Sequence, residues 1–133
     1  MRQKRILVVD DDEDLRYLWA ESLGNLGYEI LTIDDGARAL AALQDFQPDL
    51  VLLDLIMPRA ELDGVGLLSR LSADPTLTTI PIIVISGLGD PLSAKMSPET
   101  ASSFAIVGIL SKPVAIETLA REVERALRTS VAS

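Results

Sequence analysis

Carboxylates gather immediately after the first apolar stretch of the sequence. Residues 6–15 read ILVVDDDEDL, so four apolar residues run into five consecutive acids before Leu15. One or two of these acids suit the start of a helix, where Asp accepts free backbone N–H groups and faces the positive end of the helix dipole. Five exceed that need, because like charges repel and a cap uses a single side chain. From this stretch alone, a solvated turn and a cation site are equally good interpretations.

Further polar residues stand at the ends of other apolar stretches. Asp54 ends the stretch LVLLD, Ser86 ends IIVIS, and Lys112 follows the apolar residues 105–110. An aspartate at the end of a buried strand needs a reason that a turn aspartate does not, because burying an unpaired charge is costly. The pattern therefore favours a functional site, although a serine after a strand is common in any loop.

Length, charge and missing residue types exclude several classes of protein. The 133 residues suffice for one domain with its own core, and a hydrophobic content of 48% excludes wholesale disorder. The sequence has no cysteine and no histidine, which excludes disulfides, zinc hydrolases and Ser-His-Asp enzymes. The net charge of −8 argues against binding to nucleic acid or to an anionic membrane. A protein partner or a metal ion suits the composition better.

Neither secretion nor a membrane span is indicated. The N-terminus has the basic start of a signal peptide, but only four apolar residues precede Asp10, and no apolar run approaches the ~18 residues of a membrane span. We expect a cytoplasmic protein with a single domain over residues 1–133, a core within residues 4–128 and no output domain.

Strand and helix patterns alternate along the chain. Short apolar runs predict strands at residues 6–9, 28–33, 50–54, 82–86 and 105–110. Apolar residues at helical spacing predict four helices, marked in turn by Leu15, Leu18, Trp19, Leu23 and Leu26; by Leu40 and Leu43 after Asp34–Gly36; by Val65, Leu68 and Leu71 after Asp63; and by Ile116, Leu119, Val123 and Leu127. Residues 87–104 give no clean pattern, although Ser97 as N-cap and Pro98 as first residue predict a late helix there.

The predicted strands are apolar throughout, which is typical of a parallel sheet with helices on both faces. Five strand–helix units in one small domain predict an α/β, doubly wound fold around a five-stranded parallel sheet. Ligands bind at the carboxyl ends of the strands in such folds. This edge of the sheet is expected to bring together Asp10, Asp11, Asp54, Ser86 and Lys112.

Five short motifs fall on the expected strand ends and turns, namely VVDD at 8–11, LLDLIMP at 52–58, DG at 63–64, VISG at 84–87 and SKP at 111–113. In these motifs, taken in this order, the chain resembles the CheY-like receiver domain of two-component response regulators. The resemblance covers nearly all of the chain. It implies the flavodoxin-like strand order 2-1-3-4-5 and a phosphoprotein of signal transduction.

The resemblance implies a role for each residue at the sheet edge. Asp54 is the phosphoacceptor, and Mg²⁺ cancels the repulsion between its carboxylate and the incoming phosphoryl group. Asp11 and Asp54 bind the ion directly, Asp10 binds it mainly through water, and the Ile56 backbone carbonyl supplies a third protein oxygen.

The same resemblance implies the contacts of the phosphoryl group. Lys112 holds one of its oxygens and Ser86 hydrogen-bonds another. Gly87 leaves room for the donor to approach. The Lys112–Pro113 peptide bond is expected to be cis.

The chain also departs from the family pattern. The loop RAEL after Pro58 is longer than receivers usually carry. Ile109 occupies the switch position, where the family often has Tyr or Phe. Ile56 and Leu88 flank the approach to the phosphoryl group, and because both are apolar they cannot orient a hydrolytic water. We therefore expect slow loss of the phosphoryl group.

The sequence thus predicts a stand-alone receiver that takes a phosphoryl group from a histidine kinase or histidine phosphotransfer partner onto Asp54. It signals through protein–protein contacts with an unknown downstream protein and is not an enzyme, since it catalyses only its own phosphorylation and dephosphorylation. One alternative is a receiver-like binding module that is never phosphorylated. Another is a Mg²⁺-dependent phosphohydrolase. That chemistry typically needs a second acid two residues after the nucleophile, and the residue at that position here is Ile56, which argues against this alternative. A homodimer is expected only by analogy.

Overall fold

The computed structural model describes residues 3–77, 79–87 and 104–131, with side chains in the last range described to residue 128. The strands in this part are β1 (Arg5–Val9), β2 (Glu29–Ile33), β3 (Leu50–Asp54), β4 (Ile82–Ser86) and β5 (Ile106–Ser111). The helices are α1 (Glu13–Gly24), α2 (Gly36–Phe46), α3 (Gly64–Ser72) and α6 (Ile116–Val131). Leu88 and the late helix predicted from Ser97 and Pro98 lie outside the described residues.

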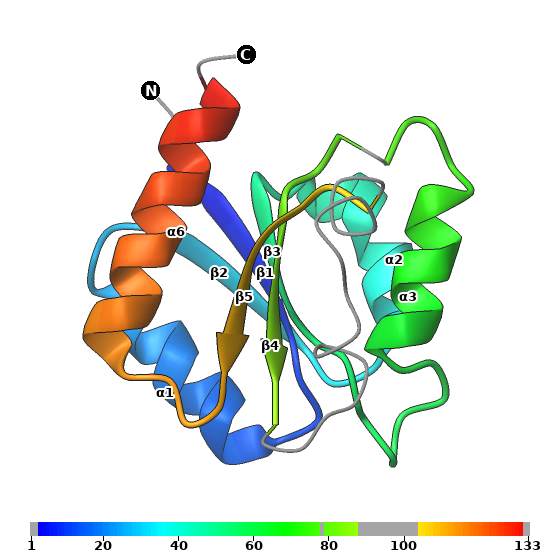
Figure 1. The fold of residues 1–133 in the computed structure, drawn as a ribbon, viewed down its shortest axis with the longest axis horizontal. Helices are drawn as coiled ribbons and strands as arrows, with labels where there is room; N and C mark the ends of the chain where they lie inside the picture. Colours follow the sequence, from blue (N-terminus) through cyan, green and yellow to red (C-terminus); the bar gives the residue numbers. More distant parts are fainter. Residues whose placement is uncertain (1–2, 78, 88–103, 132–133) are drawn as a thin grey trace.

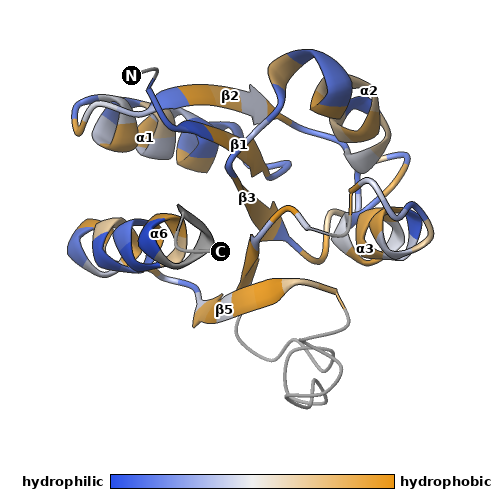
Figure 2. Cartoon of the chain, turned by 90° about the horizontal axis from the view of Figure 1, so that it is seen from above, coloured by the Kyte–Doolittle hydropathy of each residue, from blue (hydrophilic) through white to orange (hydrophobic). Residues whose placement is uncertain are grey.

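The strands form one parallel sheet in the order β2-β1-β3-β4-β5. Helices α1 and α6 cover one face of the sheet, and α2 and α3 cover the other, as Figures 1 and 2 show from two directions. The predicted doubly wound, flavodoxin-like fold with helices on both faces is confirmed.

Two apolar layers hold the sheet between its helices. Alternate residues of the central strands face each layer, so every residue of β3 and β4 is buried and β1 is buried after Arg5. Leu7 and Leu53 belong to the layer under α2 and α3, whereas Ile6 and Leu52 belong to the layer under α1 and α6. The prediction of strands that are apolar and buried throughout is confirmed for the centre of the sheet.

The edge strand β5 differs from the central strands. Ile106 and Leu110 pack into the apolar layers, but Val107 and Ile109 between them are exposed. The prediction that all five strands are buried on both faces is therefore wrong for β5, and it is also wrong for the other edge strand, β2, which is half-buried before Ile33. A strand at the edge has a neighbour on one side only and is covered less completely, so part of its side chains stay at the surface.

The apolar faces predicted for the helices are only partly buried. Trp19 and Leu23 of α1 lie in the core as predicted, but Leu18 and Leu26 are exposed. Leu18 cannot share the buried face of its neighbour Trp19, because adjacent helix residues point about 100° apart, and Leu26 lies beyond the end of α1. Val65, at the start of α3, is also exposed. The helices in the described ranges lack the combined length and apolar composition that crossing a bilayer requires.

Aspartates cap the first three helices. Asp12 Oδ1 accepts the backbone N–H groups of Asp14 and Leu15 at 3.0 and 3.2 Å. Asp63 Oδ1 accepts the N–H of Gly66 at 3.0 Å and so caps α3. One member of the acidic run therefore serves as a helix cap.

Asp35 caps α2 and also joins it to the loop between β3 and α3. Its Oδ1 accepts the N–H groups of Ala37 and Leu62 at 2.9 and 3.1 Å, and its Oδ2 accepts that of Glu61 at 2.5 Å. The N–H of Gly36 donates to the Leu62 carbonyl at 2.7 Å. The bonds from Ala37 and Glu61 lower the pKa of Asp35. The loop is thus tied to the start of α2.

Replacing Asp35 with Ala removes an acceptor that three backbone N–H groups share. We expect the free energy of unfolding to fall by about 2 kcal/mol, the upper end for a lost helix cap, as measured by urea denaturation. Asp34→Ala is the matched control, because Asp34 forms an exposed ion pair with Arg38, and such pairs contribute less than about 1 kcal/mol. Equal losses in the two variants would contradict the role given to Asp35.

Candidate functional site

Four strand ends bring polar side chains to one edge of the sheet. Asp10 follows β1, Asp54 ends β3, Ser86 ends β4 and Lys112 follows β5. The parallel register sets these ends side by side, at the lower edge of the sheet in Figure 1. The edge therefore combines residues that lie far apart in the sequence.

Three carboxylates and one ammonium form the centre of this edge. Oxygens of Asp10, Asp11 and Asp54 all lie within 4.8 Å of one another. Lys112 Nζ lies 3.1 Å from Asp10 Oδ2 and 3.2 Å from Asp54 Oδ2. Asp10 is 0% exposed and Asp54 is 5% exposed, so solvent screens their repulsion poorly. Lys112 alone cannot offset three negative charges.

These surroundings raise the pKa of Asp54 to about 6. Burial contributes most, since it disfavours the charged form, and the Asp10 carboxylate adds like-charge repulsion, while Lys112 offsets part of both effects. Burial also disfavours the Lys112 ammonium, but the carboxylates of Asp10 and Asp54 outweigh it and raise the pKa of Lys112. Lys112 therefore stays charged at neutral pH. Asp54 takes up a proton at a higher pH than an ordinary aspartate does.

Backbone N–H groups orient the two buried aspartates. The N–H of Asp12 donates to Asp10 Oδ1 at 2.9 Å, and the N–H of Ile56 donates to Asp54 Oδ1 at 3.3 Å. The other oxygen of each aspartate, Oδ2, is the one that faces Lys112. Each carboxylate is thus held by the loop that follows its own strand.

Ser86 lies beside Lys112 at the end of β4. Its carbonyl accepts the Lys112 N–H at 2.7 Å, and the Lys112–Pro113 peptide bond is cis, the isomer expected from the sequence. The hydroxyl Oγ of Ser86 is buried and has no hydrogen-bond partner among the described residues. A buried hydroxyl without a partner is costly, so this group is suited to a ligand oxygen.

The start of α3 packs directly against the end of β3. A Cβ at Gly64 would lie 2.1 Å from the carbonyl oxygen of Asp54 and 2.6 Å from Leu55 Cα, closer than any side chain tolerates. The N–H of Gly64 donates to the Leu55 carbonyl at 3.0 Å. The glycine of the DG motif thus permits α3 to close on the strand that carries Asp54.

The donor set fits a hard divalent cation. Carboxylate oxygens are the ligands that Mg²⁺ prefers, and the ion keeps several waters, so a few protein ligands suffice. Asp10 Oδ2 is buried and lacks a hydrogen bond in the described part of the chain, although Lys112 lies at ion-pair distance. A cation beside Asp10, Asp11 and Asp54 would balance the negative charge that Lys112 leaves.

The other residues predicted for the site lie around this centre or away from it. Ile56 is 42% exposed, two residues after Asp54. Gly87 follows Ser86, and a Cβ there would meet no atom of the described residues within 4 Å. Ile109 is exposed on β5, where it lies opposite Val84 of β4, two residues before the strand end at Ser111.

Two arginines at this edge were missed by the sequence reasoning. Arg16 Nη1 donates to the Asp10 carbonyl at 2.8 Å, and Arg59 Nη2 donates to the Asp11 carbonyl at 3.2 Å. Arg59 belongs to the long loop after β3, which the sequence marked by its length alone. For Arg59, the signal available in the sequence was a basic residue in the loop that follows Asp54.

A flavodoxin-like sheet with clustered acids and a lysine at its carboxyl edge is typical of receiver-type signalling domains. The chain belongs to the response regulator receiver domain family, whose model matches residues 6–124. The family resemblance seen in the sequence motifs is confirmed.

Curated relatives are longer regulators. The DNA-binding response regulator MtrA of Mycolicibacterium paratuberculosis is 34% identical over 128 residues, which cover 96% of this chain and 52% of that protein. The probable transcriptional regulator ycf27 of Cyanophora paradoxa is 41% identical over 90 residues, 68% of this chain and 36% of the relative. The chain thus spans between a third and about half of the length of these relatives.

Solved structures share the whole fold. The receiver domain of NtrX from Brucella abortus superposes with a TM-score of 0.79 at 36% identity, covering 93% of this chain and 98% of that one. The Vibrio cholerae chemotaxis protein CheY4 gives a TM-score of 0.80 at 26% identity, covering 94% and 99%.

The raised pKa of Asp54 predicts a pH dependence of stability in the metal-free protein. The folded state holds the Asp54 proton up to about pH 6, whereas the unfolded chain releases it near 3.8. Stability from this group is therefore present at low pH and lost as pH rises between these values. As the pH rises from 4 to 7, we expect the free energy of unfolding of Asp54→Asn to increase by about 2–3 kcal/mol relative to that of wild type. The measurement is urea denaturation in the presence of a chelator. A difference that stays constant with pH would contradict this cause.

Proposed function

We propose that this domain accepts a phosphoryl group on Asp54 from the phosphohistidine of a histidine kinase or histidine phosphotransfer protein. It then signals through altered protein–protein contacts. The observation that carries this proposal is the buried pair of Asp10 and Asp54 joined by Lys112 at the carboxyl edge of the sheet. The sequence holds no histidine, so the donor histidine lies outside these 133 residues.

Transfer requires Asp54 to act as a nucleophile. One of its carboxylate oxygens attacks phosphorus, a new O–P bond forms, and the N–P bond of the phosphohistidine breaks, with the electron pair remaining on the imidazole nitrogen. A pKa of about 6 leaves the carboxylate mostly ionised at neutral pH. The charge needed for attack is therefore available despite burial.

The residues around Asp54 supply contacts to the transferred group. The Lys112 ammonium, which faces Asp54 Oδ2, would pair with one phosphoryl oxygen. The hydroxyl of Ser86, which has no partner in the described part of the chain, would donate a hydrogen bond to another. No atom of the described residues lies within 4 Å of a Cβ placed at Gly87, which would leave room for the donor on that side. The Lys112 and Ser86 contacts stabilise charge on the phosphoryl oxygens as the bond to Asp54 forms.

Mg²⁺ would be held by the carboxylates of Asp10, Asp11 and Asp54 together with the Ile56 backbone carbonyl. Its contribution, when bound, is positive charge that reduces the repulsion between the Asp54 carboxylate and the phosphoryl oxygens. The protein's own part is to keep these oxygens close together, through the N–H groups that orient Asp10 and Asp54.

The names of the curated relatives describe proteins that regulate transcription or bind DNA. For this domain we propose a protein partner downstream, because its net charge of −8 does not suit direct contact with nucleic acid. Three predictions stay untested, namely that the domain acts without an output domain, that it is cytoplasmic and that it forms a homodimer.

The proposed function is tested by weighing the intact protein after incubation with acetyl phosphate and Mg²⁺. We expect one added phosphoryl group in wild type and none in Asp54→Asn, which keeps the shape of the side chain but removes the nucleophile. Addition of phosphate to Asp54→Asn would move the phosphoacceptor elsewhere. Lack of addition to either protein would favour a binding module, and rapid consumption of acetyl phosphate without accumulation would favour a phosphohydrolase.

The lifetime of the phosphoryl group follows from the side chains beside it. Ile56 is exposed two residues after Asp54, and the sequence places apolar Leu88 two residues after Ser86. Neither orients a water for attack on the acyl phosphate, so we expect slow hydrolysis in wild type. Ile56→Asn combined with Leu88→Glu should speed loss at least tenfold, or about 1.4 kcal/mol in the barrier, as followed by intact mass over time.

The control for this experiment is Val107→Asn, which alters an exposed apolar residue of β5 away from the acidic cluster. It should leave the rate of phosphoryl loss unchanged. Equal rates of phosphoryl loss in wild type and in the double variant would show that these side chains do not control the access of water to the acyl phosphate.

A further inference from the structure

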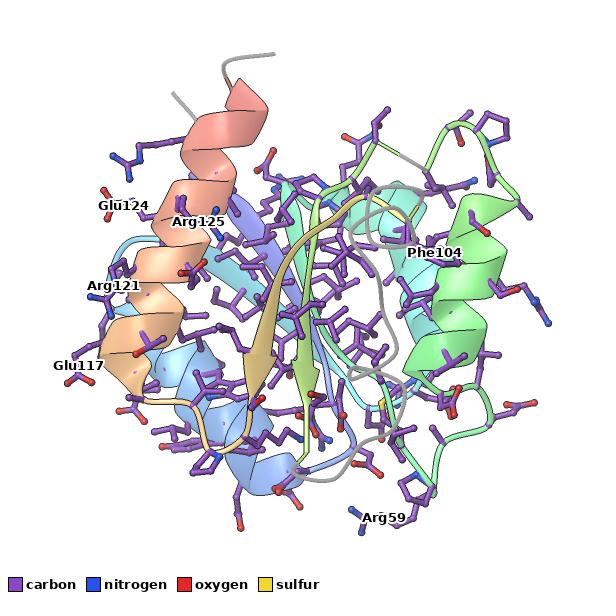
Figure 3. The ribbon with its side chains drawn as sticks, viewed as in Figure 1. Arg59, Phe104, Glu117, Arg121, Glu124 and Arg125 are labelled. Atoms are coloured by element: carbon purple, nitrogen blue, oxygen red, sulfur yellow. The ribbon has the colours of Figure 1, made fainter. Side chains whose placement is uncertain are left out.

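Arg59 reaches back over the acidic cluster from the loop after β3. Its Nε lies 3.7 Å from Asp11 Oδ2, and its Nη2 donates to the Asp11 carbonyl at 3.2 Å. The Arg59 side chain is 77% exposed while that of Asp11 is 14% exposed. Figure 3 shows Arg59 at the edge of the molecule toward which the strands point, outside the packed interior. The guanidinium thus covers Asp11 from the solvent side.

The loop that carries Arg59 is held in place on its far side. Asp35 accepts the N–H groups of Glu61 and Leu62 in this loop, and Gly36 donates to the Leu62 carbonyl. A Cβ at Gly36 would lie 2.6 Å from that carbonyl oxygen, so the loop can pack this closely only against glycine. The position of Arg59 is therefore set by a fixed loop joined to α2.

Arg59 also faces further acids. Together with Asp11, Asp34 and Asp35 it lines a cavity of about 230 Å³ that adjoins the candidate cation site. Of these acids, Asp34 is paired with Arg38, and Asp35 accepts three backbone N–H groups. Asp11 is thus the acid in this cavity whose carboxylate Arg59 meets within ion-pair distance.

We propose that Arg59 is a built-in counter-ion of the acidic site that competes with the divalent cation for Asp11. In the metal-free protein its guanidinium offsets part of the charge repulsion among the three carboxylates. A cation bound at Asp11 repels this guanidinium, which must leave the carboxylate. Arg59 therefore raises the Mg²⁺ concentration at which the site fills. This inference rests on the proposed Mg²⁺ site and makes Arg59 a positioning residue of it.

The size of the effect follows from the exposure of the pair. An exposed ion pair changes an equilibrium constant by up to about fivefold, and the repulsion between the guanidinium and a divalent ion acts in the same direction. Both terms are electrostatic, so salt screens them. A merely structural role of Arg59 would not show this dependence on salt.

The test is calorimetric titration of the full chain with MgCl₂ at low salt and again at about 1 M KCl. At low salt we expect Arg59→Ala to bind Mg²⁺ about three- to fivefold more tightly than wild type, with the difference shrinking in high salt. Arg59→Lys keeps the positive charge and should return most of the way to wild-type affinity. Arg121→Ala, which removes an exposed arginine of α6 on the other face of the sheet (Figure 3), should change the affinity less than twofold.

Metal-free melting temperatures provide a second readout and report whether each variant folds. Arg59→Ala should melt slightly lower than wild type without metal, because the counter-ion is lost, and should gain more on addition of Mg²⁺. An unchanged or weaker Mg²⁺ affinity in Arg59→Ala would overturn the inference, and so would an Asp11→Asn variant that binds Mg²⁺ as tightly as wild type. A wild-type protein that binds no Mg²⁺ would overturn both the inference and the proposed cation site.

Discussion

The burial of two aspartates beside a single lysine is the constraint on which the rest of the structure depends. Asp10 and Asp54 point their Oδ2 atoms at the same Lys112 ammonium, and neither is open to water. One positive charge cannot satisfy both carboxylates and Asp11 as well. The domain thus keeps a local excess of negative charge that its apolar core must be stable enough to support.

The fold supplies what this cluster needs. The sheet is parallel and both of its faces are covered, so the strand ends bring three carboxylates and a lysine together at one edge. Gly64 lets α3 close over the end of β3, and loop N–H groups hold one oxygen of each buried aspartate. The Ser86 hydroxyl, buried and without a hydrogen bond to any described residue, lies at the same edge. Two of the buried polar atoms that lack a hydrogen bond among the described residues, Asp10 Oδ2 and Ser86 Oγ, lie at this edge, where a cation and a phosphoryl group would meet them.

Most of the fold and the central part of the site could be predicted from the sequence, for a physical reason. Central strands buried on both faces must be apolar throughout, so β1, β3 and β4 stand out, and the residues that end them are the ones at the site. The edge strand β5 carries the same apolar composition without the same burial, so its exposed Val107 and Ile109 could not be separated from its buried residues. Arg16, in the first turn of α1, and Arg59, in the loop after β3, contact the site through long side chains, and local sequence patterns do not encode the direction of such side chains.

The central claim is that the acidic cluster lacks positive charge and gains stability from a divalent cation. The most direct measurement is the melting temperature of wild type and Asp11→Asn with and without Mg²⁺. At ten times the dissociation constant, binding adds about 1.4 kcal/mol to wild type, or about 5 °C for a domain of this size. The account predicts this rise in wild type and little or none in Asp11→Asn. An equal rise in both proteins, or none in wild type, would contradict it.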